Sequence, residues 1–202
     1  MLITHIKKYS LGCLPLLVGS CANHNLNHPL TTGELTYSAF TWHYNSTKNT
    51  FEIYIADYLR IDSNGGFIGM RHDTFMDKAK YFSGLIDDPL RKRIDSVLSI
   101  GDYDRYFNFS GNAPGMYDGF IYSIDYRKRD SLRSLPFFIP RHSPPAIQYV
   151  QSALDSLIAN AVPNSTDSFS FGGYKAKLEE KSIATGFKMP IVVPPKVELK
   201  NP

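Results

Sequence analysis

The chain is poor in cysteine, and this scarcity excludes two kinds of stabilisation at once. Of its 202 residues only Cys13 and Cys21 carry a thiol. Cys13 lies inside an N-terminal leader pattern, so the mature chain is predicted to keep Cys21 alone. A disulfide framework and a cysteine-based metal site both need more thiols than this. We therefore expect no disulfide and no cysteine-ligated metal.

The sequence also lacks a strong excess of charge and any long apolar run. It holds 22 Lys and Arg against 19 Asp and Glu, and two of these lysines, Lys7 and Lys8, belong to the leader. A nucleic-acid-binding domain normally carries a basic patch, so nucleic acid is not an expected partner. No apolar run approaches the roughly 20 residues that a membrane-spanning helix needs. Any membrane contact must therefore come from another feature.

The N-terminus has the layout of a secretory leader. Lys7-Lys8 is followed by a short apolar run from Leu11 to Val18 and then by small residues. Val18-Gly19-Ser20-Cys21 also matches a bacterial lipobox, in which the chain is cut before the cysteine and lipid is added to it. We predict a signal peptide over residues 1–20 and membrane attachment through lipid on Cys21. The alternative is an ordinary signal peptide with Cys21 as a bystander.

Residues 21–33 are polar and uncharged, which is typical of a flexible tether between a lipid anchor and a domain. His24 and His28 stand four residues apart there, but the neighbouring Asn and Pro oppose the helix that such a metal site needs. No acidic run of the kind that resembles a surface-export tag follows Cys21. We therefore expect an outer-membrane lipoprotein that faces the periplasm.

Alternating apolar residues predict the strands. The stretch 35–44 alternates and is followed by the turn cluster 45–50, so we expect a hairpin. In the returning stretch 51–61, one face is predicted to hold Phe51, Ile53, Ile55, Leu59 and Ile61. A turn at 63–66, with two glycines, leads into the next strand. Further strands are expected at 78–86, whose early part could instead be helical, and at 120–126 and 132–139.

Two helices are predicted from their start signals and apolar stripes. Asp87-Asp88-Pro89 combines a capping Asp with a proline in the first turn, and Gly101 marks the end. Ser143-Pro144-Pro145 opens the second helix, with Ser143 as its cap, and this helix ends near Pro163. The stripes are Leu90, Ile94, Val97 and Leu98 in the first helix and Ile147, Val150, Leu154, Leu157 and Ile158 in the second.

Together these segments predict a single α+β domain over residues 34–162, built on an antiparallel sheet with two helices on one face. Each half runs strand, turn, strand and then a proline-started helix, and the stretch 94–98 resembles 154–158. This order is that of a ββα duplication. Residues 163–202 are rich in Ser, Gly and Pro, so we expect an extended or partly disordered tail.

The order of features over residues 51–158 resembles a family of uncharacterised lipoprotein domains of Bacteroidota. The shared features are an alternating strand that leads into a glycine-containing turn, a helix that ends before an aromatic segment, and a strand pair followed by a proline-led helix. The resemblance implies an α+β fold and a place in the bacterial envelope. It implies no activity, because none is established for the family.

The mature sequence offers little for catalysis or metal binding. It contains no Gly-x-Ser-x-Gly motif, and only His72-Asp73 and His142-Ser143 pair a histidine with a residue useful for catalysis. Neighbours on a strand point to opposite faces, which would separate His72 from Asp73. Asp57 interrupts an apolar strand face, and this is more typical of a β-bulge or an edge than of a metal ligand. We expect no cofactor and no metal.

The strand face opposite the apolar residues of 51–61 carries Tyr54, Tyr58 and Arg60. If both helices cover the other face, this aromatic face is open to an envelope protein or a glycan. We therefore expect a lipid-anchored, non-enzymatic binding or scaffolding module. Two alternatives stay open: an envelope hydrolase that uses His72 or His142, and an immunity or inhibitor protein directed at one enzyme.

Overall fold

A computed structural model describes residues 34–73, 78–100, 103, 119–128, 131–163 and 171–184. The strands within them are β1 Leu35–Asn45, β2 Thr50–Ile61, β3 Gly66–Arg71, β4 Lys80–Leu85, β5 Ile121–Lys128 and β6 Ser131–Ser134. The helices are α1 Asp88–Ile100, α2 Pro145–Asn160 and α3 Gly172–Ala184, with a 3-10 turn η2 at Pro140–His142. The predicted leader, Cys21 and the tether lie outside the described residues. Among the helices described, none is long and apolar enough to cross a bilayer.

The strands form one antiparallel sheet in the order β4-β3-β2-β1-β5-β6. The first four strands follow one another as a meander, and β5 then pairs with the other side of β1. The turn between β2 and β3 contains Gly65 at φ 86°, a left-handed conformation that glycine adopts without steric cost. The first strand of the chain is therefore central in the sheet, and the predicted antiparallel α+β fold is confirmed.

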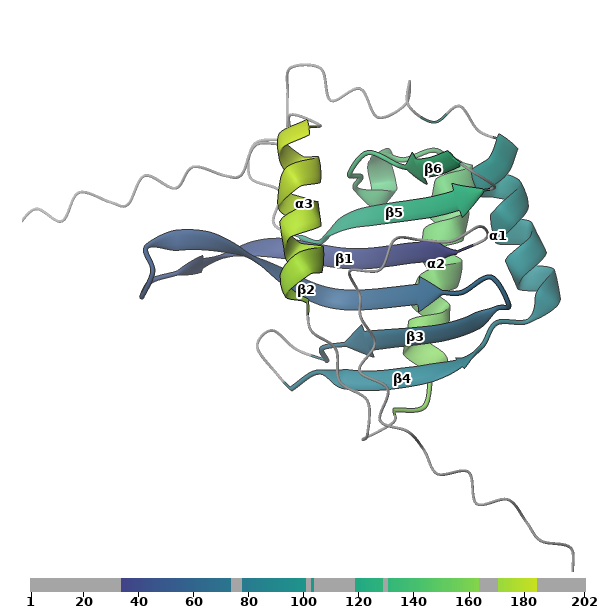
Figure 1. Cartoon of the computed structure of the whole chain (residues 1–202), viewed down its shortest axis with the longest axis horizontal. Coiled ribbons are helices and arrows are strands. Elements are labelled where there is room, and N and C mark those ends of the chain that lie inside the picture. Colours follow the sequence, from purple (N-terminus) through teal and green to yellow (C-terminus); the bar gives the residue numbers. More distant parts are fainter. Residues whose placement is uncertain are drawn as a thin grey trace, which may run out of the picture.

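Two helices, α1 and α2, cover one face of the sheet, as predicted (Figure 1). Asp87 caps α1, because its Oδ1 accepts a hydrogen bond from the Leu90 N–H at 2.8 Å. Ile94 of α1 and Leu154 of α2 are both buried in this core. The buried part of the α2 stripe is Ile147, Val150, Leu154 and Ile158. These helix residues form one core with apolar residues of β1 to β5 and with Ile86, which directly follows β4.

The third helix, α3, lies across the opposite face of the sheet (Figure 1). This corrects two predictions: residues 172–184 are helical rather than extended, and the second sheet face is covered rather than open. Tyr174 and Leu178 stand one helical turn apart and are buried against the sheet, which explains why the helix docks there. The domain therefore extends beyond residue 162. Residues 185–202 of the predicted tail lie outside the described residues.

The segment before α2 also differs from its prediction. Of the strand expected at 132–139, only Ser131–Ser134 pairs as β6, and Phe138 makes an isolated bridge with Tyr122 of β5. Ser143 does not cap α2, because Pro144 occupies the capping position and the Ser143 Oγ donates to the Pro140 carbonyl at 2.7 Å. The hydroxyl therefore stabilises η2, one turn earlier than expected.

A β-bulge interrupts β2 at Ala56. Ala39 of β1 pairs with Asp57, whereas the next residue, Phe40, pairs with Ile55. Ala56 is therefore the extra residue of a bulge, and the bulge that Asp57 predicted is confirmed.

The bulge reverses which residues of β2 face each side of the sheet. Leu59 and Ile61 belong to the core under α1 and α2, whereas Ile53 and Ile55 belong to the core under α3. The prediction that the apolar residues of 51–61 share one face is therefore wrong. The inserted residue shifts the alternation of side chains by one position. The apolar residues before the bulge therefore face α3, and those after it face α1 and α2.

Candidate functional site

The bulge also separates the residues predicted to form a binding face. Tyr54 lies opposite Thr41 of β1, and Tyr58 lies opposite Ser38. Thr41 and Ser38 are three positions apart on a regular strand, so they point to opposite faces, and residues paired across strands share a face. Tyr54 therefore lies on the face of α2 and Tyr58 on the face of α3. The predicted face of Tyr54, Tyr58 and Arg60 does not exist as one surface.

Both tyrosines are buried. Tyr58 is 1% exposed, because α3 covers it with the rings of Phe171 and Tyr174, whose centroids lie 5.4 and 5.0 Å away. Tyr54 is 8% exposed and lies between two histidine rings, His43 at 6.3 Å and His72 at 5.1 Å. Neither ring is presented to a ligand in this structure.

Arg60 is also engaged within the chain. Its guanidinium lies 3.0 Å from the Glu34 carboxylate, and the two side chains are only 14% and 11% exposed. Breaking such a largely buried ion pair would leave an uncompensated charge, so the contact holds both side chains in place. Glu34 directly precedes β1, so this pair fastens the start of β1 to β2.

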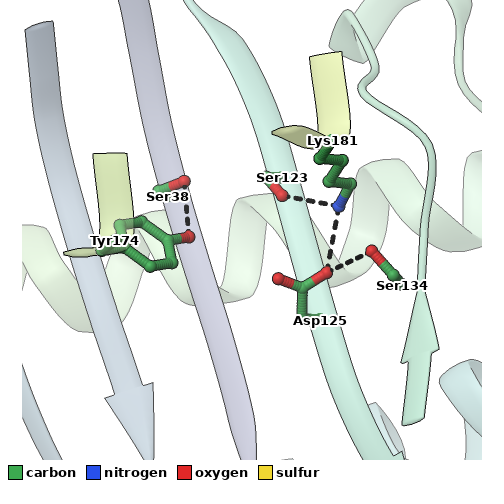
Figure 2. Close-up of polar contacts among 6 residues, drawn as sticks. All are labelled: Ser38, Ser123, Asp125, Ser134, Tyr174 and Lys181. Carbon is green, nitrogen blue, oxygen red and sulfur yellow. Dashed lines mark hydrogen bonds and ion pairs between the residues drawn. The ribbon is translucent and has the colours of Figure 1, made fainter. Parts of the chain in front are cut away.

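A polar network fastens α3 to the sheet (Figure 2). The Lys181 ammonium donates to Ser123 Oγ at 2.8 Å and to Asp125 Oδ1 at 3.0 Å. Ser134 of β6 donates to the same carboxylate oxygen at 2.5 Å. Toward the other end of α3, the Tyr174 hydroxyl donates to Ser38 at 3.0 Å. Three strands and one helix are joined by these bonds.

The contact between Lys181 and Ser123 has the residue types of a serine–lysine hydrolase pair. Burial lowers the pKa of Lys181, and Asp125 opposes this effect by favouring the charged amine. Ser123, however, is wholly buried, so its hydroxyl cannot meet a substrate while α3 is in place. The network therefore positions α3 and does not form an active site.

A second polar cluster lies on the face of α2, beside the bulge. The Tyr37 hydroxyl and the Gln151 amide both donate to the Asp155 carboxylate. The Oδ1 of Asp57 is buried without a hydrogen-bond partner. Burial raises the pKa of Asp57 to about 6, Asp155 adds to the rise, and Arg71 opposes it. Burial also raises the pKa of Asp155, although its two hydrogen bonds oppose the change.

This pair of carboxylates was not predicted as a unit, because Asp57 and Asp155 are far apart in the chain. Only the bulge signal at Asp57 could have drawn attention to the position. A carboxylate with a pKa near neutrality can donate or accept a proton. Among the described residues, no group of three His, Cys, Asp or Glu side chains could hold a metal ion.

The two histidines of the hydrolase alternative lie in different surroundings. His72 follows β3, and its ring lies against Tyr54. Its backbone N–H donates to the Ala56 carbonyl at 2.9 Å, which ties it to the bulge. His142 is exposed at the end of η2.

The feature that stands out from the sheet is the hairpin formed by residues 41–56, which we call the β1–β2 arm. β1 pairs with β5 only from Leu35 to Phe40, and β2 pairs with β3 only from Asp57 to Ile61. Beyond these points the two strands continue as a pair, and Figure 1 shows the arm extending past the rest of the sheet. The signal was present in the sequence, since 35–44 and 51–61 are longer than the other predicted strands.

The arm has an ordered tip and an aromatic side. The Asn45 side chain accepts hydrogen bonds from the N–H groups of Thr47 and Lys48, each at 3.1 Å. Tyr44, 49% exposed, packs against Phe51 across the arm, with ring centroids 5.5 Å apart. Such a cross-strand aromatic pair stabilises the pairing of the two strands in the arm.

The two polar clusters and the arm differ in their exposure to solvent. The clusters beneath α2 and α3 are enclosed, whereas the outer part of the arm is exposed at Tyr44 and over residues 46–50. Comparison with protein-family models found no match for this chain, and comparison with curated proteins found none.

Proposed function

We propose that this protein is a lipid-anchored, non-enzymatic binding module of the bacterial envelope, and that the β1–β2 arm is its binding surface. The observation that carries the proposal is the pairing of β1 and β2 beyond the ends of their neighbouring strands. A hairpin projecting from a rigid sheet presents main-chain groups and aromatic side chains together, and both are used in protein recognition.

The position of the anchor in the sequence supports the arm as the binding surface. Cys21 and the tether precede β1 in the sequence, so they join the sheet at Glu34. β1 then runs 11 residues to Asn45, at the base of the arm's tip. At about 3.3 Å per residue the tip lies roughly 36 Å from the point of attachment. An anchored domain would therefore present the arm away from its own attachment site.

The lipid is tested with Cys21→Ala. We expect this variant to leave the membrane fraction or to accumulate as unprocessed precursor, because the thiol that receives the lipid is gone. Fractionation and the mass of the processed chain measure both results. Normal processing with full membrane recovery would refute lipidation. Protease treatment of intact cells tests the periplasmic orientation, since digestion of the protein would place it on the cell surface.

The arm is tested by capture of the lipidated protein from solubilised native membranes. Tyr44→Ala removes the exposed ring of the arm, and the matched control Leu132→Ala removes an exposed apolar side chain from β6. We expect Tyr44→Ala to lower recovery of the bound partner about tenfold or more, as truncation of an aromatic anchor does. Leu132→Ala should leave recovery unchanged. Equal recovery in both variants would rule out the arm as the binding surface.

A further inference from the structure

At the end of the sheet opposite the arm, one row of residues crosses the sheet from edge to edge (Figure 1). Leu85 of β4 pairs with Gly66 of β3, whose carbonyl accepts a hydrogen bond from the Asp62 N–H at 2.8 Å. Leu132 of β6 pairs with Arg127 of β5, whose N–H donates to the Glu34 carbonyl at 3.0 Å. The two halves meet one position beyond the last pair of β1 with β2. We call this the anchor row: Leu85, Gly66, Asp62, Glu34, Arg127 and Leu132.

Both ends of the anchor row carry an exposed leucine, and the two leucines point to the same face of the sheet. Leu85 is 81% exposed and Leu132 is 54% exposed. Phe82, three positions before Leu85 in β4, belongs to the core under α1 and α2, so Leu85 points to the opposite face. Tyr126 belongs to the same core, so its neighbour Arg127 and the paired Leu132 also point to that opposite face.

The membrane anchor predicted from the sequence joins the sheet between these two leucines. Residues 21–33 separate the predicted lipid on Cys21 from Glu34, in the middle of the anchor row. A flexible chain of that length spans on the order of 20 Å. The row would therefore stay close to the bilayer, where even weak contacts form because the tether raises the local concentration of lipid. The tip of the arm, roughly 36 Å from Glu34, lies beyond that distance.

We propose that the anchor row rests on the lipid bilayer, with Leu85 and Leu132 inserted at the boundary between headgroups and acyl chains. This contact rests on the proposed function and specifies how the lipid-anchored domain is oriented. Interfacial attachment gains strength with the apolar area that enters the membrane. A leucine on each side of the anchor holds the row along the membrane surface and directs the arm away from it.

Arginine side chains stand beside both leucines. Arg127 is the cross-strand partner of Leu132. On the side of Leu85, the Arg91 guanidinium donates to the Ser63 carbonyl in the turn between β2 and β3. An arginine stem lies along apolar groups while its cation meets lipid phosphate, which suits the same boundary. Two aspartates also lie at this end, just before Pro89, so apolar insertion and not net charge carries the attachment.

The spacing of the two leucines favours a bilayer over a protein surface. Five strand intervals of about 4.8 Å separate β4 from β6, so the leucines lie roughly 24 Å apart. The ion pair of Glu34 and Arg60 belongs to the strands between them. A stable protein interface needs a contiguous, well-packed apolar centre. A bilayer is continuous, so it accepts two separated side chains equally well.

The scarcity of cysteine makes this contact measurable. Leu85→Cys, Leu132→Cys and Thr47→Cys each add one thiol to the domain, and each is labelled with a fluorophore. The full-length lipidated protein is placed in vesicles of phosphatidylethanolamine and phosphatidylglycerol, with and without a nitroxide on the acyl chains. We expect the nitroxide to quench the labels at positions 85 and 132 at least about threefold more than the label at position 47, in the tip of the arm.

A second set of variants tests the leucines themselves, with the label at Ser131→Cys. Leu85→Asp combined with Leu132→Asp should lower the quenching to that of the Thr47 label, because a charged side chain does not enter the apolar boundary. Isoleucine at the same two positions should preserve it. Phe120→Asp, which places the same charge at an exposed apolar residue at the other end of β5, should preserve it too. Circular dichroism checks that each variant is folded.

Each contrary outcome overturns a different statement. Equal quenching at the three positions of lipidated protein would overturn the membrane contact and leave the proposed function standing. Stronger quenching at Thr47 would overturn both the contact and the arm as a protein-binding surface. A blue shift of the labels that grows with protein density, without quenching by lipid, would identify a second copy and overturn the lipid as occupant. A processed chain without lipid on Cys21 would overturn the anchor and the contact together.

Discussion

Asp57 carries a carboxylate that the fold keeps protonated at mildly acidic pH. Its folded pKa is about 6, against 3.8 in an ordinary environment, because burial and the nearby Asp155 disfavour the charged form. The folded state therefore binds the proton more tightly than the unfolded state. The resulting stabilisation is fully present below pH 3.8 and is lost as the pH rises through about 6.

Asp57→Asn should make stability less sensitive to pH. The amide keeps the shape of the side chain but cannot ionise beside Asp155, so the cost of a buried charge disappears. Between pH 5 and 7.5 the wild-type protein should lose about 1.4 kcal/mol that the variant keeps. Urea unfolding at several pH values measures this. Asp88→Asn, at an exposed carboxylate, serves as the control, and identical slopes for the two variants would contradict the assignment.

Lys181 should be the most sensitive position of α3. Lys181→Met removes the ammonium and leaves Asp125 in a largely enclosed site with Ser134 as a donor. Breaking an enclosed ion pair costs about 3–5 kcal/mol, and here the cost falls on the docking of α3. Hydrogen exchange should show loss of protection in residues 172–184 while α2 stays protected.

The control for this experiment lies on the same helix. Lys177 is exposed, so Lys177→Met changes the same residue type without touching the network. It should leave the exchange of α3 unchanged. Replacing Asp125 by Asn in the Lys181→Met protein should restore part of the protection, since the unpaired charge is then gone. A Lys181→Met protein with normal exchange in α3 would show that the network does not hold the helix.

At the scale of whole elements, the sequence predicted the strands and both proline-started helices, but it assigned the apolar residues of β2 to one face and did not predict α3. An alternating pattern shows that side chains alternate between faces, but it does not show which face each one occupies. The apolar residues of 51–61 therefore look as if they share one face, although the bulge at Ala56 places the two halves of the strand on opposite faces. Asp57 signalled the bulge without showing its effect on Tyr54 and Tyr58. In α3 the apolar stripe is short, and its docking depends on polar partners in β5 that no local pattern reveals.

The helices α1 and α2 should carry much of the stability of the domain. Ile94→Ala and Leu154→Ala each leave a cavity at a buried position, and each should lower the free energy of unfolding by about 2–5 kcal/mol. Leu132→Ala, at a residue that is 54% exposed, should change it by less than about 0.5 kcal/mol. Denaturant unfolding measures all three. Matching midpoints for the buried and exposed variants would contradict this account of the core.

At the scale of the whole molecule, helices cover both faces of the centre of the sheet, and the outer part of the arm is exposed. The sequence predicted an open aromatic face, and that surface is instead the seat of α3. Whether a hairpin projects from a sheet depends on how far its neighbouring strands extend beside it. This is a property of strand pairing, and the residue pattern within one strand does not encode it. The proposed binding surface is therefore the projecting end of the β1–β2 pair and not the side chains in the middle of β2.

The central place of β1 has a consequence for how the chain acquires its fold. β1 is made before the other described strands, and β2 to β4 can pair beside it as soon as they emerge, because four residues separate each of the first pairs and eight separate β3 from β4. Its other edge, residues 35–40, waits for β5, which follows only after α1 and a long stretch of chain. Late closure of a long loop slows folding and leaves a strand edge exposed to other chains. During synthesis the edge of β1 at residues 35–40, which later lies in the centre of the sheet, is thus an unpaired strand edge that is prone to aggregation.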